Sequence, residues 1–89
     1  MLYLIHLEPR YKHAGHYLGY TRGHWVDRVQ RHVAGHGSPL IRAALAAGCK
    51  LSVTRVWRHG TRTDERRLKN GGGLSRHCPV CRASGTYHA

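Results

Sequence analysis

The spacing of the apolar residues changes from a strand-like to a helical pattern at about residue 23. Before this point, residues 2–7 (LYLIHL) and 16–21 (HYLGYT) are rich in β-forming types, which predicts two strands paired as a hairpin. Glu8 and Pro9 predict that the first strand ends there and that a loop leads to the second. Over residues 23–34 the apolar residues instead recur at helical spacing, and glycines end the pattern. The chain therefore opens with a hairpin that leads into a helix.

A second helix and a third strand follow. Ser38 is a favourable N-cap and Pro39 suits the first helical position, so a short alanine-rich helix is predicted to begin there and to end at Gly48. Residues 50–57 (KLSVTRVW) alternate apolar and polar side chains, which is typical of a strand.

The last predicted helix is capped by Thr61 or Thr63 and runs to about Lys69, where a glycine run ends it. The element order β-β-α-α-β-α predicts an α+β fold, with a small three-stranded, mostly antiparallel sheet flanked by helices. Because 89 residues suffice for one domain at most, we expect a single domain over residues 1–74 and a C-terminal extension over 75–89.

The charge balance predicts a polyanionic partner. Fifteen Lys and Arg face four Asp and Glu, for a formal net charge of +11. Such an excess costs self-repulsion, and nucleic acid is its simplest explanation, ahead of an anionic membrane surface. We expect DNA as the partner; RNA, a protein partner and a homodimer all remain open.

The sequence lacks the features of a membrane or secreted protein. No apolar run reaches the length of about 18 residues that a spanning helix needs. Residues 1–7 are too short for the core of a signal peptide and lack a preceding basic region. Three cysteines do not make an even disulfide set. We therefore expect an intracellular, cytoplasmic protein that has no membrane partner.

Spacing alone suggests one group of candidate site residues. Arg28 and His32 are four residues apart and so share one helix face, which we expect to look toward the tyrosines of the strands. Asp64 and Glu65 both lie in the first turn of the last helix, where acids are favoured. Both are within one turn of Leu68, so periodicity does not say which acid turns inward.

In order along the chain, four segments resemble the motifs of the GIY-YIG nuclease domain family, and the resemblance covers about residues 1–70. They are Leu2-Tyr3, the segment HYLGYT at 16–21, Arg28-Val29 with His32 and Gly35, and ERRLK from Glu65. The resemblance implies that Tyr3 and Tyr17 are the motif tyrosines, with Gly19 as the motif glycine. It also implies a catalytic Arg28, a neighbouring His32 and a metal-binding Glu65.

The chain also departs from the family pattern. The first motif reads Met-Leu-Tyr, and the separation of Tyr3 and Tyr17 is longer than expected, which predicts an enlarged hairpin loop. The family asparagine that follows the glutamate has no clear counterpart, and Ser75 or His77 is a candidate replacement.

The resemblance implies an endonuclease that hydrolyses phosphodiester bonds of DNA with one Mg²⁺ or Mn²⁺. Glu65 is the metal ligand, since Mg²⁺ usually takes only one or two protein carboxylates. Arg28 suits stabilisation of phosphate charge in the transition state. Tyr3 is assigned the role of base and Tyr17 the positioning of water, the reverse remaining open, and we expect a lowered pKa for one of them. The alternative is a basic nucleic-acid-binding module without catalysis.

Several basic residues can surround such a site and contact phosphates without reading sequence. They are Arg22, Arg31, Arg62, Arg66 and Lys69.

The C-terminal extension carries half of a zinc signature. Cys78 and Cys81 have the C-x-x-C spacing, and His77 and His88 are further candidate ligands, but a structural site needs four ligands. A structural zinc site, a redox-active or unpaired dithiol and no special role all remain open. Cys49 is expected to be simply buried.

Overall fold

The computed structural model describes residues 1–71 and 73–84. Its centre is a three-stranded antiparallel sheet with the strand order β2-β1-β3. The strands are β1 (Leu2–Tyr11), β2 (Ala14–Tyr20) and β3 (Lys50–Trp57). The predicted α+β class and the antiparallel sheet are confirmed.

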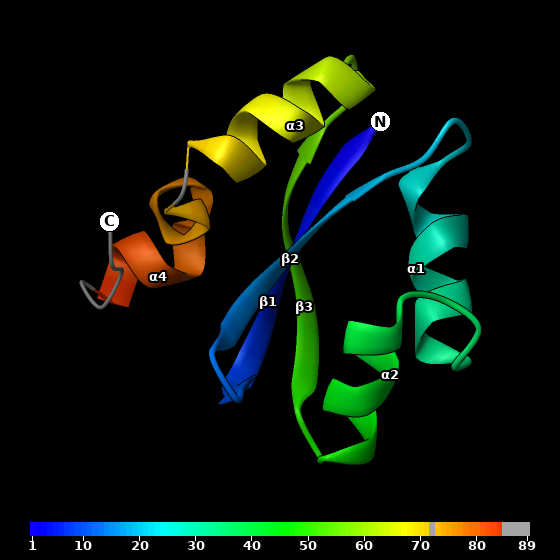
Figure 1. Ribbon diagram of the computed structural model, residues 1–89, viewed down its shortest axis with the longest axis vertical. Coiled ribbons are helices and arrows are strands. Elements are labelled where there is room, and N and C mark those ends of the chain that lie inside the picture. Colours follow the sequence, from blue (N-terminus) through cyan, green and yellow to red (C-terminus); the bar gives the residue numbers. More distant parts are fainter. Residues whose placement is uncertain (72, 85–89) are drawn as a thin grey trace.

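The helices lie on the two sides of the sheet (Figure 1). Helices α1 (Trp25–Val33) and α2 (Pro39–Ala46) cover one face, and α3 (Arg62–Asn70), η1 (Leu74–His77) and α4 (Pro79–Ser84) lie on the other. Within the described ranges, no helix is long and apolar enough to cross a membrane.

Strand β1 is central and buried on both faces. Tyr3 and Ile5 pack into the core beneath α1 and α2, whereas Leu2 and Leu4 pack into a second core with residues of the C-terminal helices. The burial follows from strand geometry, since successive side chains point to opposite faces. One strand thus supports two cores, and the polar residues of its two faces belong to two separate sites.

The helix ends agree with the sequence. The Ser38 side chain accepts a hydrogen bond from the backbone N–H of Leu40 at 3.2 Å, which confirms the predicted cap of α2. The Thr61 hydroxyl accepts from the N–H of Asp64, and the Asp64 carboxylate accepts from the N–H of Thr61, which is a capping box. Thr61 is therefore the cap of α3, and Thr63 lies within the helix.

The predicted end of the first strand and the enlarged hairpin loop are both wrong. β1 continues past Pro9 to Tyr11, and only Lys12 and His13 lie between Tyr11 and its partner Ala14. Proline is tolerated here because the β1–β2 pairing is interrupted between His6 and Tyr11, so no regular hydrogen bond to β2 is lost at this position. The additional residues lengthen the strands instead of the loop.

Most of the described part of the segment after α3 is helical. It forms η1 and α4, and it places Cys78 and Cys81 in the second core against Leu2, Leu4 and Leu18. This segment therefore completes the hydrophobic cover of the sheet.

Candidate functional site

Three aromatic side chains meet on the face of the sheet that α1 covers. The Tyr3 hydroxyl of β1 lies 2.8 Å from Nε2 of His32 on α1. The ring of Tyr17, from β2, lies 6.4 Å from the Tyr3 ring and 5.3 Å from the His32 ring, centroid to centroid. The structure thus brings together Tyr3, Tyr17 and His32.

His32 is held rigidly, and its hydrogen bonds define its tautomer. It is fully buried, and its Nδ1 accepts a hydrogen bond from the N–H of Ser38 at 3.1 Å. A neutral imidazole whose Nδ1 accepts carries its proton on Nε2, so His32 donates to the Tyr3 oxygen. Burial, together with the charge of Arg28, lowers the pKa of His32 and favours this neutral form.

Tyr3 is a phenol in this environment. Burial and the neighbouring Tyr17 raise the pKa of Tyr3 to about 12, although Arg28 opposes the change through its charge and a hydrogen bond. The expected lowering of a tyrosine pKa is therefore wrong for Tyr3 in the protein alone, because loss of hydration outweighs the basic surroundings.

Arg28 approaches the same hydroxyl from α1. It lies one turn before His32 and its side chain is half-buried. It is also a hydrogen-bond partner of Tyr3. Two donors, an imidazole N–H and a guanidinium, therefore converge on one phenol oxygen.

The two acids of α3 have separate environments. Asp64 is held by Thr61 in the capping box, and these hydrogen bonds lower the pKa of its carboxyl. The Glu65 side chain is 19% exposed, lies 3.6 Å from Lys69, and acts electrostatically on Tyr3. Asp64 therefore caps the N-terminus of α3, whereas Glu65 is the acid that interacts electrostatically with Tyr3.

Gly19 determines how closely the Tyr3 ring can pack. A Cβ at Gly19 would lie 2.2 Å from Cζ of Tyr3 and 2.4 Å from its hydroxyl oxygen. We expect Gly19→Ala to displace the buried ring and to lower the free energy of unfolding by about 1–3 kcal/mol, as measured by urea denaturation.

The matched control for this substitution is Gly15→Ala on the same strand. A Cβ there meets only the Arg10 side chain, at 3.5 Å, an ordinary contact. We expect a change of about 0.5 kcal/mol or less. Equal effects of the two substitutions would contradict a specific role of Gly19 under the Tyr3 ring.

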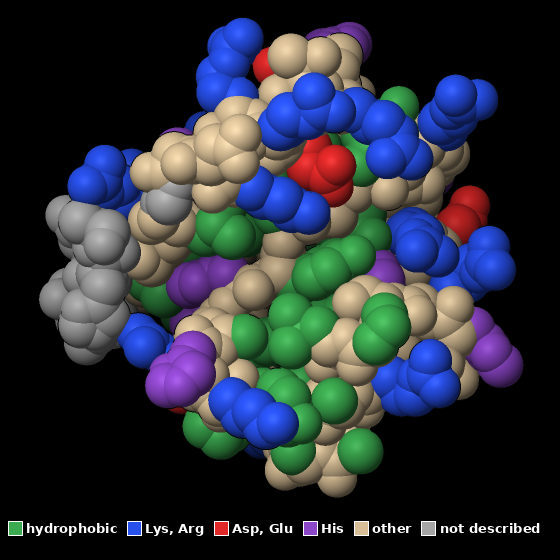
Figure 2. All heavy atoms as spheres, in the orientation of Figure 1, with side chains coloured by type: hydrophobic (Ala, Val, Ile, Leu, Met, Phe, Trp, Pro, Cys, Tyr) green, Lys and Arg blue, Asp and Glu red, His purple; other side chains and the backbone are tan. Residues whose placement is uncertain are grey.

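The predicted phosphate-binding residues are all exposed. Arg62 stacks over the Tyr20 ring at 4.9 Å, which places it near the end of β2 that leads to Arg22. Lys69 pairs with Glu65. Figure 2 shows Lys and Arg side chains gathered over α3, around acidic side chains at the same place. Arg31 lies in the last turn of α1, on the other side of the sheet from α3 (Figure 1).

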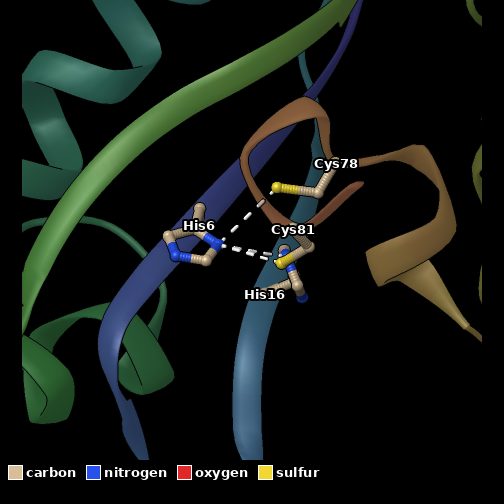
Figure 3. Close-up of side chains that lie close together, drawn as sticks. All are labelled: His6, His16, Cys78 and Cys81. Carbon is tan, nitrogen blue, oxygen red and sulfur yellow. Dashed lines mark hydrogen bonds between the residues drawn. The ribbon is translucent and has the colours of Figure 1, made fainter. Parts of the chain in front are cut away.

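A second cluster lies on the opposite face of the sheet. Cys78 and Cys81 approach His6 of β1 and His16 of β2, and the four ligand atoms lie within 4.8 Å of one another (Figure 3). These side chains could hold a metal ion. His77 instead packs against Trp57, at 6.2 Å between ring centroids, and His88 lies outside the described residues.

His6 and His16 were not predicted from the sequence as metal ligands, although the strand pairing offers one indication that they lie together. They are directly paired across β1 and β2, in the register that also pairs Tyr3 with Gly19. Paired residues point to the same face of a sheet, so aligning the motif tyrosine with the motif glycine would also have aligned the two histidines.

The two thiols of this cluster differ in acidity. Burial raises the pKa of Cys78, but hydrogen bonds with Thr54, with Cys81 and with the Val80 backbone outweigh it, so that its pKa is lowered overall. Burial and the neighbouring Cys78 raise the pKa of Cys81 to about 11. The pKa shifts of the two thiols are therefore opposite in direction.

The two candidates for the missing asparagine lie away from Tyr3. Ser75 is buried and lines a pocket together with His6 and Cys81. His77 contacts Trp57, a residue of the second core. Both belong to the side of the sheet that carries the Cys and His cluster.

Comparisons of this chain with protein-family models, with curated proteins and with solved structures found no significant match.

Proposed function

We propose that the protein is a GIY-YIG-type endonuclease, a metal-dependent hydrolase of phosphodiester bonds in DNA. One observation carries the proposal. The Tyr3 hydroxyl of β1 meets His32 and Arg28 of α1 beside the Tyr17 ring of β2, and Glu65 of α3 acts electrostatically on it. A module that only binds nucleic acid has no need to direct an arginine and a histidine at one buried phenol.

The proposed proton acceptor is the Tyr3 oxygen in its ionised form, so Tyr3 must first lose its own proton, which a cation bound nearby would favour. The N–H of His32 and the guanidinium of Arg28 both stabilise negative charge there. Tyr17, which is half-buried, lies beside the Tyr3 ring, and we assign it the orientation of the attacking water. His32 is a positioning residue, because it is fully buried and acts through Tyr3.

Arg28 is the proposed stabiliser of the phosphate in the transition state. Its side chain is only half-buried, so the guanidinium can donate to Tyr3 and also to a phosphate oxygen. Developing negative charge on phosphorus oxygens is the part of this reaction that needs fixed donors most.

Glu65 is the residue that would hold Mg²⁺ or Mn²⁺. Its side chain is mostly buried, and among the described residues it belongs to no group of three or more acidic, His or Cys ligands. This suits an ion that takes one carboxylate and fills its remaining positions with water and phosphate. Such an ion would act as a Lewis acid toward the phosphate and favour the ionised forms of nearby oxygen acids.

The basic surface predicts a salt-dependent interaction with DNA. If about six phosphates are contacted, log K should fall with log salt at a slope of roughly −5. Fluorescence anisotropy with a labelled duplex measures this slope, and Arg66→Ala should make it shallower by about 1. A slope near zero would contradict the polyanion partner.

The function itself is tested by incubating the purified protein with duplex, branched and single-stranded DNA and with RNA, in Mg²⁺ and in Mn²⁺. Nicks or breaks that require the metal and disappear in Glu65→Ala support the proposal. Protection of the nucleic acid without cleavage, under all of these conditions, would support the binding module instead.

A further inference from the structure

The cluster on the second face of the sheet has the composition of a structural zinc site. Its ligands come from three separate segments: His6 from β1, His16 from β2, and Cys78 and Cys81 from the C-terminal segment (Figure 3). Two imidazoles and two thiols are one of the ligand sets of four-coordinate zinc. Half of this set was visible in the sequence as C-x-x-C, and the fold supplies the other half.

Four of the six distances between the ligand atoms match the edges of a tetrahedron around one ion, and all six are within 4.8 Å. Zn–S bonds of about 2.3 Å and Zn–N bonds of about 2.0–2.1 Å imply edges of about 3.5 Å between sulfur and nitrogen and about 3.3 Å between two nitrogens. In the structure, Nδ1 of His6 lies 3.6 Å from Sγ of Cys78 and 3.5 Å from Sγ of Cys81. Nε2 of His16 lies 3.3 Å from Sγ of Cys81 and 3.3 Å from Nδ1 of His6.

The groups that contact the four ligand side chains also agree with a zinc site. The other ring nitrogen of His6 lies 2.8 Å from the Glu8 carboxylate. A carboxylate at this position orients a metal-bound histidine and raises its basicity. The Cys78 sulfur lies 3.5 Å from the Thr54 hydroxyl and also meets backbone N–H groups of Val80 and Cys81. The two backbone N–H groups stabilise a thiolate.

Burial distinguishes a structural site from a catalytic one. Cys78 is 0% exposed and Cys81 is 7% exposed. Four protein ligands also leave no open position for substrate. A pocket of about 570 Å³ borders His6, His16 and Cys81 and gives an ion a route of entry.

We propose that His6, His16, Cys78 and Cys81 bind one zinc ion that fastens the C-terminal segment to the β1–β2 hairpin. Cys78 and Cys81 form no disulfide, so both sulfurs can coordinate a metal ion. A redox-active dithiol would not need two histidine nitrogens at tetrahedral distances from the sulfurs. The site lies on the opposite face of the sheet from Tyr3, so its existence does not depend on the nuclease proposal.

The first test is the metal content of the purified protein. We expect about one zinc per chain. Replacement by Co²⁺ should give the intense visible absorption of a tetrahedral site and a charge-transfer band from thiolate. Chelation should lower the melting temperature by about 10 °C or more, since the binding energy of a structural zinc is also folding energy.

Variants with matched controls identify the ligands. Cys81→Ser and His16→Gln should each lose zinc and the Co²⁺ spectrum, whereas Cys49→Ser and His77→Gln, which replace residues of the same types outside the cluster, should keep both. Glu8→Gln leaves all four ligands in place and should weaken zinc binding about 10–100-fold.

Two results would overturn the proposal. The first is wild-type protein that contains no zinc, gives no tetrahedral Co²⁺ spectrum and melts at the same temperature with and without chelator. The second is a Co²⁺ spectrum that Cys81→Ser leaves unchanged. If a ligand variant fails to fold, titration of chelator-treated wild type and of Glu8→Gln with Co²⁺ still decides, because these proteins retain all four ligands.

Discussion

Glu65→Gln is expected to lower the rate of metal-dependent DNA cleavage about 10³-fold, with DNA binding unchanged or stronger. The substitution keeps the shape of the side chain and removes the charge that would hold the divalent ion. A loss of about 4 kcal/mol of transition-state stabilisation corresponds to this factor. Binding should not weaken, because one negative charge facing phosphates is lost. Gel assays of plasmid nicking, combined with anisotropy of a labelled duplex, measure both quantities.

The matched control is Asp64→Asn, which removes the neighbouring charge. Asp64 accepts hydrogen bonds from Thr61 at the start of α3, so its loss should affect the end of the helix and leave cleavage within about 3-fold of wild type. Similar losses of cleavage in the two variants would mean that both substitutions act by disturbing the start of α3, and not by removing a metal ligand. Full activity in Glu65→Gln would refute the proposed metal ligand.

The second large effect is expected for Arg28→Lys, which should reduce the cleavage rate about 100-fold with little change in DNA affinity. Lysine keeps the charge but cannot donate two parallel hydrogen bonds, and its single ammonium cannot serve the Tyr3 hydroxyl and a phosphate in the fixed geometry of a guanidinium. Single-turnover cleavage at saturating protein separates this effect from binding.

Arg31→Lys on the same helix is the control for that experiment. Arg31 is exposed near the end of α1, so exchanging it for another cation should leave the rate within about 3-fold of wild type. If both substitutions change the cleavage rate by the same small factor, Arg28 is not the proposed stabiliser of the transition state.

Local signals in the sequence predicted most of the fold. The hairpin, the capped helix after Ser38, the strand over residues 50–57 and the helix from Thr61 all depend on residues close together in the chain. The wrong prediction at Pro9 has a tertiary cause. An isolated strand would end at this residue, but here it lies where the pairing with β2 is interrupted, and pairing of Glu8 with Lys50 continues the strand on the other side.

The Tyr3 cluster was predicted more completely than the cluster around Cys78. The first could be assembled from a resemblance that names one residue in each element. The second depends on contacts between residues such as His6 and Cys78, which are 72 positions apart, and no local pattern encodes that separation. The pKa of Tyr3 also lay beyond the sequence, because it depends on how deeply the fold buries the ring.

Because both sites use side chains of strand β1, an insertion or deletion in this strand would affect them together. Tyr3 faces one side of the strand and His6 the other, and each is aligned with its partners by the same register. A substitution can therefore alter one site and spare the other. Inserting or deleting a single residue between them would reverse the side chains on one part of the strand, so the length of this short segment is constrained even where its residue types are not.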